Sequence, residues 1–216
     1  MLQTETIERD TFELLKILMQ DEKLLHFNLV GGTALALYLG HRKSIDLDLF
    51  SLHTLNIVDL EQHLMNIYNF KNQNPTKKHD MTLIGSINNI KVDFIIYDYP
   101  VVNPILIQDN IRIYSINDIA AMKLTAISQS GTRLKDFVDI AFLSTKMTLK
   151  EMLDSFEVKY PRTNKISALK GLSYFDDIDF SIKIELIEGD FKWKNIEKRL
   201  IEMIKYPNKV FLKSPI

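Results

Sequence analysis

A short stretch at residues 45–50 constrains the fold of this chain more than any other. Its residues alternate strictly, with Leu47 and Leu49 on one side and Asp46 and Asp48 on the other. Because side chains at i and i+2 lie on the same face of a β-strand, the pattern predicts a strand that carries two carboxylates side by side. Like charges held this close repel one another, and a cation between them would relieve the repulsion.

Oxygen ligands of this kind suit Mg²⁺ or Mn²⁺, and Mg²⁺ completes its coordination with waters and substrate phosphates. For the paired aspartates alone, the favoured interpretation is a half-buried strand with a polar outer face.

A turn that precedes this strand shifts the interpretation toward a functional site. Gly31 and Gly32 follow an apolar run at residues 27–30, and strong helix formers follow at residues 33–37. Glycines let the backbone approach a bound group, the free N–H groups of a helix start favour an anion, and Thr33 adds a hydroxyl where a phosphate oxygen would lie.

A third carboxylate lies in the strand-like run at residues 90–96. Asp93 shares one face of that run with Lys91 and Ile95, where an acid is costly to bury without a partner. If this strand pairs beside the strand of the first two aspartates, three carboxylates could hold two metal ions. Such a pair would activate an attacking oxygen and stabilise leaving pyrophosphate. From its strand alone, Asp93 is open between a functional and a structural role.

In the second half of the chain, Lys123 falls inside the apolar arc of a helix expected to begin at residue 116. Such a lysine either reaches solvent or points into a cleft toward an anion such as a triphosphate.

The helix expected at residues 133–143 carries further charged residues. Lys135 and Asp139 are four residues apart, which favours a surface ion pair worth about 0.3–0.5 kcal/mol. Asp136 lies at the edge of the apolar face and is a candidate for the cleft. Arg42 could contact phosphate or only cap a loop.

The remaining pattern predicts an α+β protein. Helices are expected at residues 6–25, 33–37, 58–67, 116–128, 133–143, 149–156, 165–172 and 193–204, and hairpins at residues 81–97 and 105–114, turning at Asn88-Asn89 and Asp109-Asn110. We expect residues 1–114 to form an α/β core and residues 115–216 a helical region that completes the cleft. No flexible linker marks the boundary.

Composition excludes several classes of function. The net charge of −1 over 216 residues gives no overall case for wrapping nucleic acid. Two basic runs, residues 71–79 and 159–170, are each best interpreted as solvated loops. The absence of cysteine excludes disulfides and thiolate metal sites. No apolar run approaches the ~20 residues needed to span a bilayer, and the polar, acidic residues 1–10 are unlike a secretory signal, so we expect a cytoplasmic protein without a membrane partner.

Residues 29–37 (LVGGTALAL) and 41–50 (HRKSIDLDLF) resemble the AbiEii/AbiGii toxin family of bacterial abortive-infection proteins. Residues 118–123 and 133–139 look like the downstream motifs of that family. The resemblance extends through residues 169–177 and 193–204, and so covers nearly the whole chain. It implies a polymerase-beta-like nucleotidyltransferase fold, in which a small mixed β-sheet carries the acids and a helical C-terminal region completes the cleft.

The resemblance also implies roles for particular residues. Asp46 and Asp48 fall on the metal-binding acids of the family, and Lys123 and Asp136 on its downstream lysine and aspartate. Thr33, after Gly32, stands where many nucleotidyltransferases have serine, whereas the match at Asp93 rests on strand order. The resulting predictions are catalytic roles for Asp46, Asp48, Asp93, Lys123 and Asp136, metal binding by Asp46, Asp48 and Asp93, and nucleotide binding by Gly31, Gly32, Thr33, Arg42 and Lys123.

Members of the family are toxins of toxin–antitoxin systems, typically paired with a DNA-binding antitoxin, and some transfer nucleotides to the acceptor end of transfer RNA. The leading hypothesis is therefore that the chain is the toxin of a type IV-like toxin–antitoxin or abortive-infection system. As such it would be a metal-dependent enzyme that transfers a nucleotide from a nucleoside triphosphate to an acceptor hydroxyl, with the 3′ end of tRNA as one candidate acceptor. Two alternatives stay open: a nucleotide-binding protein of the same fold without turnover, and a transferase that modifies a small molecule such as an antibiotic.

Overall fold

The computed structural model describes residues 1–74 and 81–216. Within these ranges a mixed sheet of seven strands has the order β3-β4-β5-β2-β1-β7-β6. The strands are β1 (Phe27–Val30), β2 (Leu47–Ser51), β3 (Lys71–Asn72), β4 (Thr82–Ile87), β5 (Ile90–Ile96), β6 (Leu106–Gln108) and β7 (Ile111–Ile113). The α-helices are α1 (Arg9–Gln20), α2 (Gly31–Leu39), α3 (Ile57–Tyr68), α4 (Ile116–Gln129), α5 (Leu134–Leu143), α6 (Leu149–Lys159), α7 (Lys165–Leu172) and α8 (Trp193–Lys205). The α+β architecture predicted from the sequence is confirmed.

The centre of the sheet brings the predicted acids together. Strand β2 runs antiparallel to β1 and parallel to β5, and in the second pairing Asp48 lies opposite Asp93. Along β2 the even-numbered residues are half-buried while Leu47 and Leu49 are fully buried. The alternation predicted for residues 45–50 and the pairing of the two acidic strands are therefore both confirmed.

Asparagine and aspartate turns set the registers of the two hairpins. Asn88 and Asn89 have φ values of 51° and 66° between β4 and β5, and Asp109 and Asn110 have 52° and 62° between β6 and β7. Two consecutive residues with positive φ match the twist of the flanking strands, and asparagine and aspartate tolerate this backbone better than other residues with side chains. Both predicted hairpins are confirmed.

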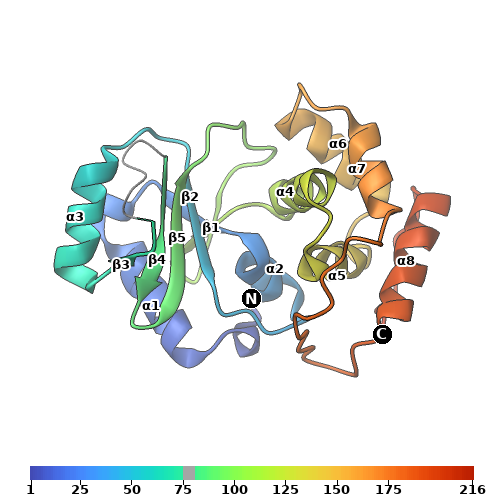
Figure 1. Ribbon diagram of the computed structural model, residues 1–216, viewed down its shortest axis with the longest axis horizontal. Helices are drawn as coiled ribbons and strands as arrows, with labels where there is room; N and C mark the ends of the chain where they lie inside the picture. The colour runs from blue at the N-terminus through green and yellow to red at the C-terminus, as the bar shows by residue number, and fades with distance from the viewer. Residues whose placement is uncertain (75–80) are drawn as a thin grey trace.

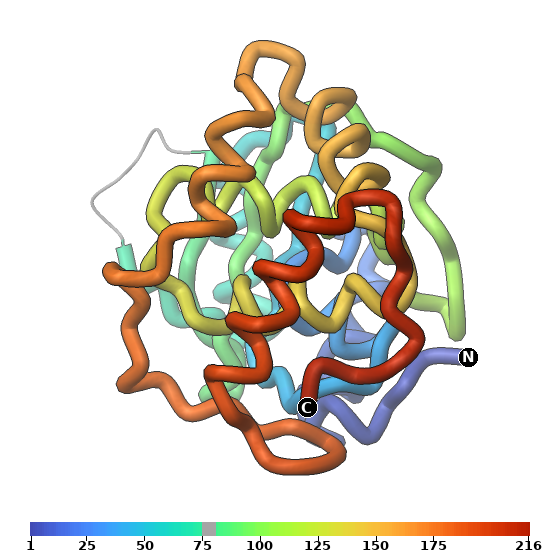
Figure 2. Tube along the Cα trace, turned by 90° about the vertical axis from the view of Figure 1, so that its right-hand side faces the viewer, coloured from blue at the N-terminus to red at the C-terminus, as the bar shows by residue number. Residues whose placement is uncertain are grey.

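The helices cover the sheet in two groups, as Figure 1 shows. Helices α1 and α3 lie on one side of the sheet, and α2 lies on the other, between the sheet and the group from α4 to α8. Within that group α4 packs against α5, α6 and α7, and α8 packs on the outer side of α5 (Figure 2). Residues 6–25 do not form one helix as expected. Ile7 instead pairs with Ser44 in a β-bridge, and the Asp21 side chain accepts from the N–H of Lys23 to begin a separate 3-10 turn.

The two halves of the chain share one hydrophobic core. Ser115, at the boundary expected between them, caps α4 by accepting from the N–H of Asp118. The segment between α7 and α8 then returns to the first half, where Ile187 N donates to the His41 carbonyl and Glu185 O accepts from Lys43 N. The division at residue 115 stays a prediction. None of the helices within the described ranges combines the length and hydropathy needed to cross a bilayer.

Candidate active site

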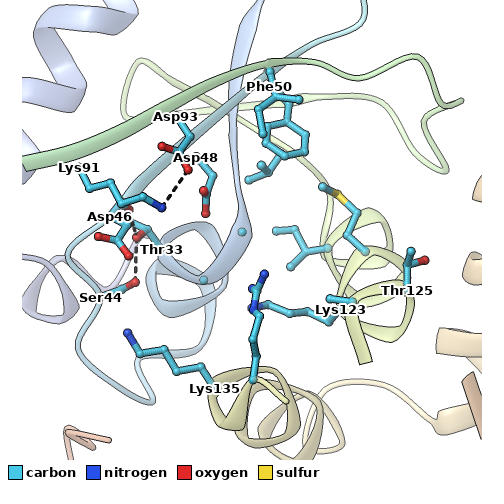
Figure 3. A pocket seen from close by; sticks show the side chains of 18 of the residues that line it. Thr33, Ser44, Asp46, Asp48, Phe50, Lys91, Asp93, Lys123, Thr125 and Lys135 are labelled. Atoms are coloured by element: carbon cyan, nitrogen blue, oxygen red, sulfur yellow. Dashed lines mark hydrogen bonds and ion pairs between the residues drawn. The ribbon is translucent and has the colours of Figure 1, made fainter. Parts of the chain in front are cut away.

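The predicted residues surround one cavity of about 640 Å³ between the sheet and the helices α4 and α5 (Figure 3). Its lining includes every residue of the predicted site except one: Gly31, Gly32, Thr33, Arg42, Asp46, Asp48, Asp93 and Lys123. Asp136 is the exception, because its side chain is buried behind Lys123. In Figure 3 the three aspartates group on the sheet side, whereas Lys123 and Lys135 approach from the helices.

The acidic side of the cavity carries charge that the protein only partly balances. Burial and the neighbouring charge of Asp93 raise the pKa of Asp48, as expected for two carboxylates opposite each other on paired strands. Lys91 Nζ lies 2.9 Å from Asp93 Oδ2, while Asp93 Oδ1 is buried without a hydrogen-bond partner in the described structure. Within residues 1–74 and 81–216, no three His, Cys, Asp or Glu side chains are placed to hold a metal by themselves. The unbalanced charge fits a cation whose coordination is completed by other ligands such as phosphate and water.

The glycine turn makes room for the charged groups around it. Gly31 has a φ of +73°, which favours glycine, and a Cβ there would collide with Asp48 Oδ2 and lie 2.9 Å from its Cγ. A Cβ on Gly32 would lie 2.5 Å from Arg42 Nη2. The residue before the helix is Val30, which has no side-chain group to cap the first N–H groups of α2. The two glycines therefore let Asp48 and Arg42 lie against the turn, and no side chain among the described residues caps the start of α2, whose first N–H groups favour an anion.

Thr33 connects this turn to the acidic strand. Its buried hydroxyl donates to the backbone carbonyl of Asp46 and lies 2.8 Å from Ser44 Oγ. These contacts fix the backbone that carries Asp46 against the first turn of α2. The contact between the Thr33 hydroxyl and a phosphate stays a prediction.

Opposite the aspartates, the cationic side of the cavity is organised around Asp139, a role that the sequence did not predict. It accepts two hydrogen bonds from Arg42, with Nε–Oδ1 and Nη2–Oδ2 distances of 2.7 and 2.9 Å, and one from His41 Nε2 at 2.8 Å. Lys123 Nζ lies 2.7 Å from its Oδ2. Burial alone would raise the pKa of Asp139, but the charges of Arg42 and Lys123 and the bonds from His41 and Arg42 hold it well below its usual range. The carboxylate is therefore ionised and anchors Arg42 at the cavity.

Lys123 is bound to two aspartates. Its Nζ lies 2.6 Å from Asp136 Oδ1 as well as beside Asp139, and Arg133 Nε lies 2.9 Å from Asp136 Oδ2. Burial lowers the pKa of Lys123, but the two carboxylates outweigh this effect and raise it overall. Lys123 is thus a protonated, buried lysine at the cavity wall, consistent with its predicted position inside the apolar arc of α4.

The prediction of a surface ion pair between Lys135 and Asp139 is wrong. Asp139 is fully buried in its network, and Lys135 instead lines the cavity, where burial and the charge of Arg42 lower its pKa. Every residue of α5 except Lys135 is buried, so Asp139 cannot form a surface ion pair. A buried carboxylate must be paired, and Asp139 is paired by Arg42, His41 and Lys123, which all lie outside α5.

The two basic runs do not behave as simple solvated loops. Lys159 is fully buried and pairs with Asp118 at 2.8 Å, and residues 165–170 belong to α7. In the run at residues 71–79, Lys71 and Asn72 form β3. Residues 75–79 of that run lie outside the described residues.

Known proteins resemble this chain in sequence and in fold. The sequence model of the family described as "Nucleotidyl transferase AbiEii toxin, Type IV TA system" matches residues 13–205. The uncharacterized protein aq_aa25 of Aquifex aeolicus (strain VF5) is 36% identical over 163 residues, which cover 70% of this chain and 74% of that protein. The crystal structure of JHP933 from Helicobacter pylori has a TM-score of 0.52 at 17% identity and covers 93% of this chain and 92% of its own. A second H. pylori structure has a TM-score of 0.50 at 17% identity, with coverages of 92% and 95%.

Proposed function

This chain belongs to the AbiEii nucleotidyl transferase toxin family, and on that premise we propose that it transfers a nucleotide from a nucleoside triphosphate to an acceptor hydroxyl with the help of a divalent metal ion. The family and the nucleotidyltransferase fold predicted from the sequence are confirmed. The chain is a nucleotidyltransferase of a family described by its type IV toxin–antitoxin system. The metal, the acceptor and the residue roles belong to the proposal.

One observation carries the proposal: an anion-binding turn, paired carboxylates and a basic wall line the same cavity. We assign the β- and γ-phosphates to the N–H groups at the start of α2, beside Gly31 and Gly32, where the helix dipole favours negative charge. Lys135 forms no ion pair with any residue in the described ranges, and its ammonium group is therefore available to the same phosphates.

Asp46 and Asp48 would hold the metal ion, which we take to be Mg²⁺ or Mn²⁺. When bound, such an ion neutralises phosphate charge and polarises the α-phosphoryl group. Gly31 supports this arrangement because its missing Cβ leaves the Asp48 carboxylate free to lie against the turn. Thr33 supports it by holding the backbone of Asp46.

The transfer itself is an in-line displacement. An acceptor oxygen forms a bond to the α-phosphorus, the bond from that phosphorus to the β-phosphate oxygen breaks, and pyrophosphate leaves. We assign Asp93 Oδ1, which is buried without a hydrogen-bond partner among the described residues, as the acceptor of the hydroxyl proton. Arg42 and Lys123 would stabilise the negative charge of the leaving group, and Asp136 and Asp139 would keep both cations in place. Positioning and charge neutralisation would then supply most of the rate.

We propose RNA as the acceptor, with the 3′ end of tRNA as the first candidate, and a protein antitoxin as the partner that controls the activity. Both assignments follow from the family to which the chain belongs. The basic residues at the helical side of the cavity are compatible with a nucleic-acid end that enters the cleft.

The proposal is tested by incubating the protein with each α-labelled nucleoside triphosphate, Mg²⁺, and total RNA and protein extracts. We expect label in the small-RNA fraction, and loss of at least a hundredfold in the Asp46→Asn, Asp48→Asn double variant. The matched control is Asp154→Asn, which removes an exposed carboxylate on α6 and should leave labelling unchanged. Labelling by the double variant at the wild-type rate would contradict the assignment of the site.

A further inference from the structure

The cavity has a second end, which is aromatic. On β2, Phe50 follows Asp48 by two residues and so lies on the same face, and Tyr97 stands in the same relation to Ile95 just beyond β5. The Phe50 and Tyr97 rings lie 5.0 Å apart between centroids, with an interplanar angle of 44°, and both line the cavity. Because two residues of a strand span about 6.6 Å, these rings lie one step along the sheet from the carboxylates. Figure 3 places Phe50 on the far side of the aspartates from Ser44 and Lys135.

Helix α4 provides an apolar surface at the same cavity. Ile119, Met122 and Ala126 line it on one side, while the two aromatic rings belong to the sheet. Phe50 and Met122 are only half-buried, so part of each faces the open space of the cavity. One cavity therefore combines an end suited to an anionic ligand with an end lined by aromatic and apolar side chains, which is the distribution of polarity within a nucleotide.

Tyr97 is held rigidly in place. Its hydroxyl lies 2.5 Å from the hydroxyl of the buried Tyr160, and its ring faces Lys159 Nζ at 5.7 Å. Lys159 donates to the carbonyl of Pro100 at 3.0 Å and pairs with Asp118, both partners of that pair being fully buried. A ring fixed in this way loses little conformational entropy when a ligand stacks on it.

The same ion pair fixes the loop that follows Tyr97. Asp118 accepts hydrogen bonds from the backbone N–H groups of Val102 and Asn103, at 2.9 and 3.2 Å. These contacts tie the connection between β5 and β6 to the first turn of α4. Lys159 and Asp118 are thus positioning residues for the aromatic end of the cavity.

We propose that Phe50 and Tyr97 form the platform on which the base of the bound nucleoside triphosphate stacks. This inference rests on the proposed function, since it places the phosphates at the glycine turn and the base at the other end of the same cavity. Stacking on aromatic rings tolerates any base, because every base has a π-face. The platform therefore contributes to the affinity for all four nucleotides.

Binding of a base-containing ligand and of a base-free ligand separates this platform from the phosphate site. The probes are α,β-methylene ATP, which cannot be cleaved between those phosphates, and inorganic tripolyphosphate, each titrated calorimetrically with Mg²⁺. We expect Phe50→Leu and Tyr97→Leu to lower the affinity for the nucleotide analogue about 5- to 150-fold, the range for loss of one stacked base, and to change the affinity for tripolyphosphate less than about twofold. Tyr206→Leu is the matched control, because it removes an exposed tyrosine that does not line the cavity, and it should change neither affinity.

Unchanged affinity for the analogue in both leucine variants, or equal loss for both ligands, would overturn the platform. A measurement on the wild type avoids any dependence on variants that fold poorly: the triphosphate of 2-aminopurine riboside should lose fluorescence on binding, because stacking quenches that base. Binding without quenching would overturn the proposal while leaving the proposed function intact. If the wild type binds neither the analogue nor tripolyphosphate, the proposed function fails and the platform with it.

Discussion

Replacing Asp139 with asparagine removes the carboxylate on which three buried side chains converge. Arg42, His41 and Lys123 all lie within 2.9 Å of its oxygens, and the side chains of Asp139, Arg42 and Lys123 are at most 6% exposed. Removing one partner of a buried ion pair leaves an uncompensated charge and costs about 3–5 kcal/mol. Asparagine keeps one acceptor oxygen, so we expect a loss near the lower end, about 3 kcal/mol.

The effect should appear in both chemical and thermal unfolding. For a chain of this size, 1 kcal/mol shifts the melting temperature by about 2–4 °C, so the variant should melt about 6–12 °C below the wild type. The pKa of Asp139 is lowered in the folded state, and its contribution is therefore fully present above its ordinary pKa and is lost as the pH falls through the folded value. The gap between wild type and variant should thus be widest near neutral pH and should narrow in acid.

The matched control is Asp154→Asn, which removes a carboxylate from an exposed i,i+4 pair with Lys150 and should cost at most about 0.5 kcal/mol. A double-mutant cycle with Arg42→Met provides a second check, because removing both partners should cost less than the two single losses added together. A shift for Asp139→Asn no larger than that of the control, or strictly additive losses, would refute the proposed buried network.

Three further outcomes are expected around the turn and the acids. Gly31→Ala should abolish transfer and destabilise the fold by more than Gly131→Ala does. Both glycines have a positive φ, but only a Cβ at Gly31 would meet Asp48. Denaturant unfolding of both variants measures the difference, and equal losses of stability would argue against the contact. Asp48→Asn should raise the melting temperature of the metal-free protein at neutral pH. The pKa of Asp48 is raised in the folded state, so ionisation of this carboxyl destabilises the fold as the pH rises through that pKa, and asparagine removes the charge. Thermal scans with EDTA and with Mg²⁺ test this, and Mg²⁺ should stabilise the wild type more than the variant. Thr33→Val should lower the free energy of unfolding by about 1–3 kcal/mol, because it leaves the Asp46 carbonyl without its hydrogen bond, whereas Thr33→Ser keeps the hydroxyl and should cost much less. Equal unfolding midpoints for the two variants would contradict the contact.

Local signals in the sequence were sufficient for the elements that carry the site. The alternation of residues 45–50 and the glycines before it predicted the acidic strand and the turn, since both depend on neighbours in the chain. The two asparagine-rich turns likewise fixed their hairpins. Lys123 was recognised because its position in an apolar arc is a local property of one helix.

Contacts between distant segments could not be predicted in the same way. Asp139 lies 97 residues from Arg42, and its pairing depends on how α5 packs against the segment after α2. Lys135 was assigned to a surface pair because the i,i+4 spacing on one helix says nothing about what the neighbouring elements bury. The aromatic end of the cavity also arises from sheet register, which brings Phe50 beside Tyr97 only when β2 and β5 run parallel.

The central claim is that the cavity transfers a nucleotide and releases pyrophosphate. The most direct measurement compares nucleoside triphosphates labelled at the α- and γ-phosphorus, with Mg²⁺ and total RNA as acceptor. The proposed reaction predicts that α-label enters the acceptor, that γ-label appears only in pyrophosphate, and that both signals are lost in the Asp46→Asn, Asp48→Asn double variant. Transfer of γ-label to the acceptor, or α-label incorporation that survives in the double variant, would contradict it.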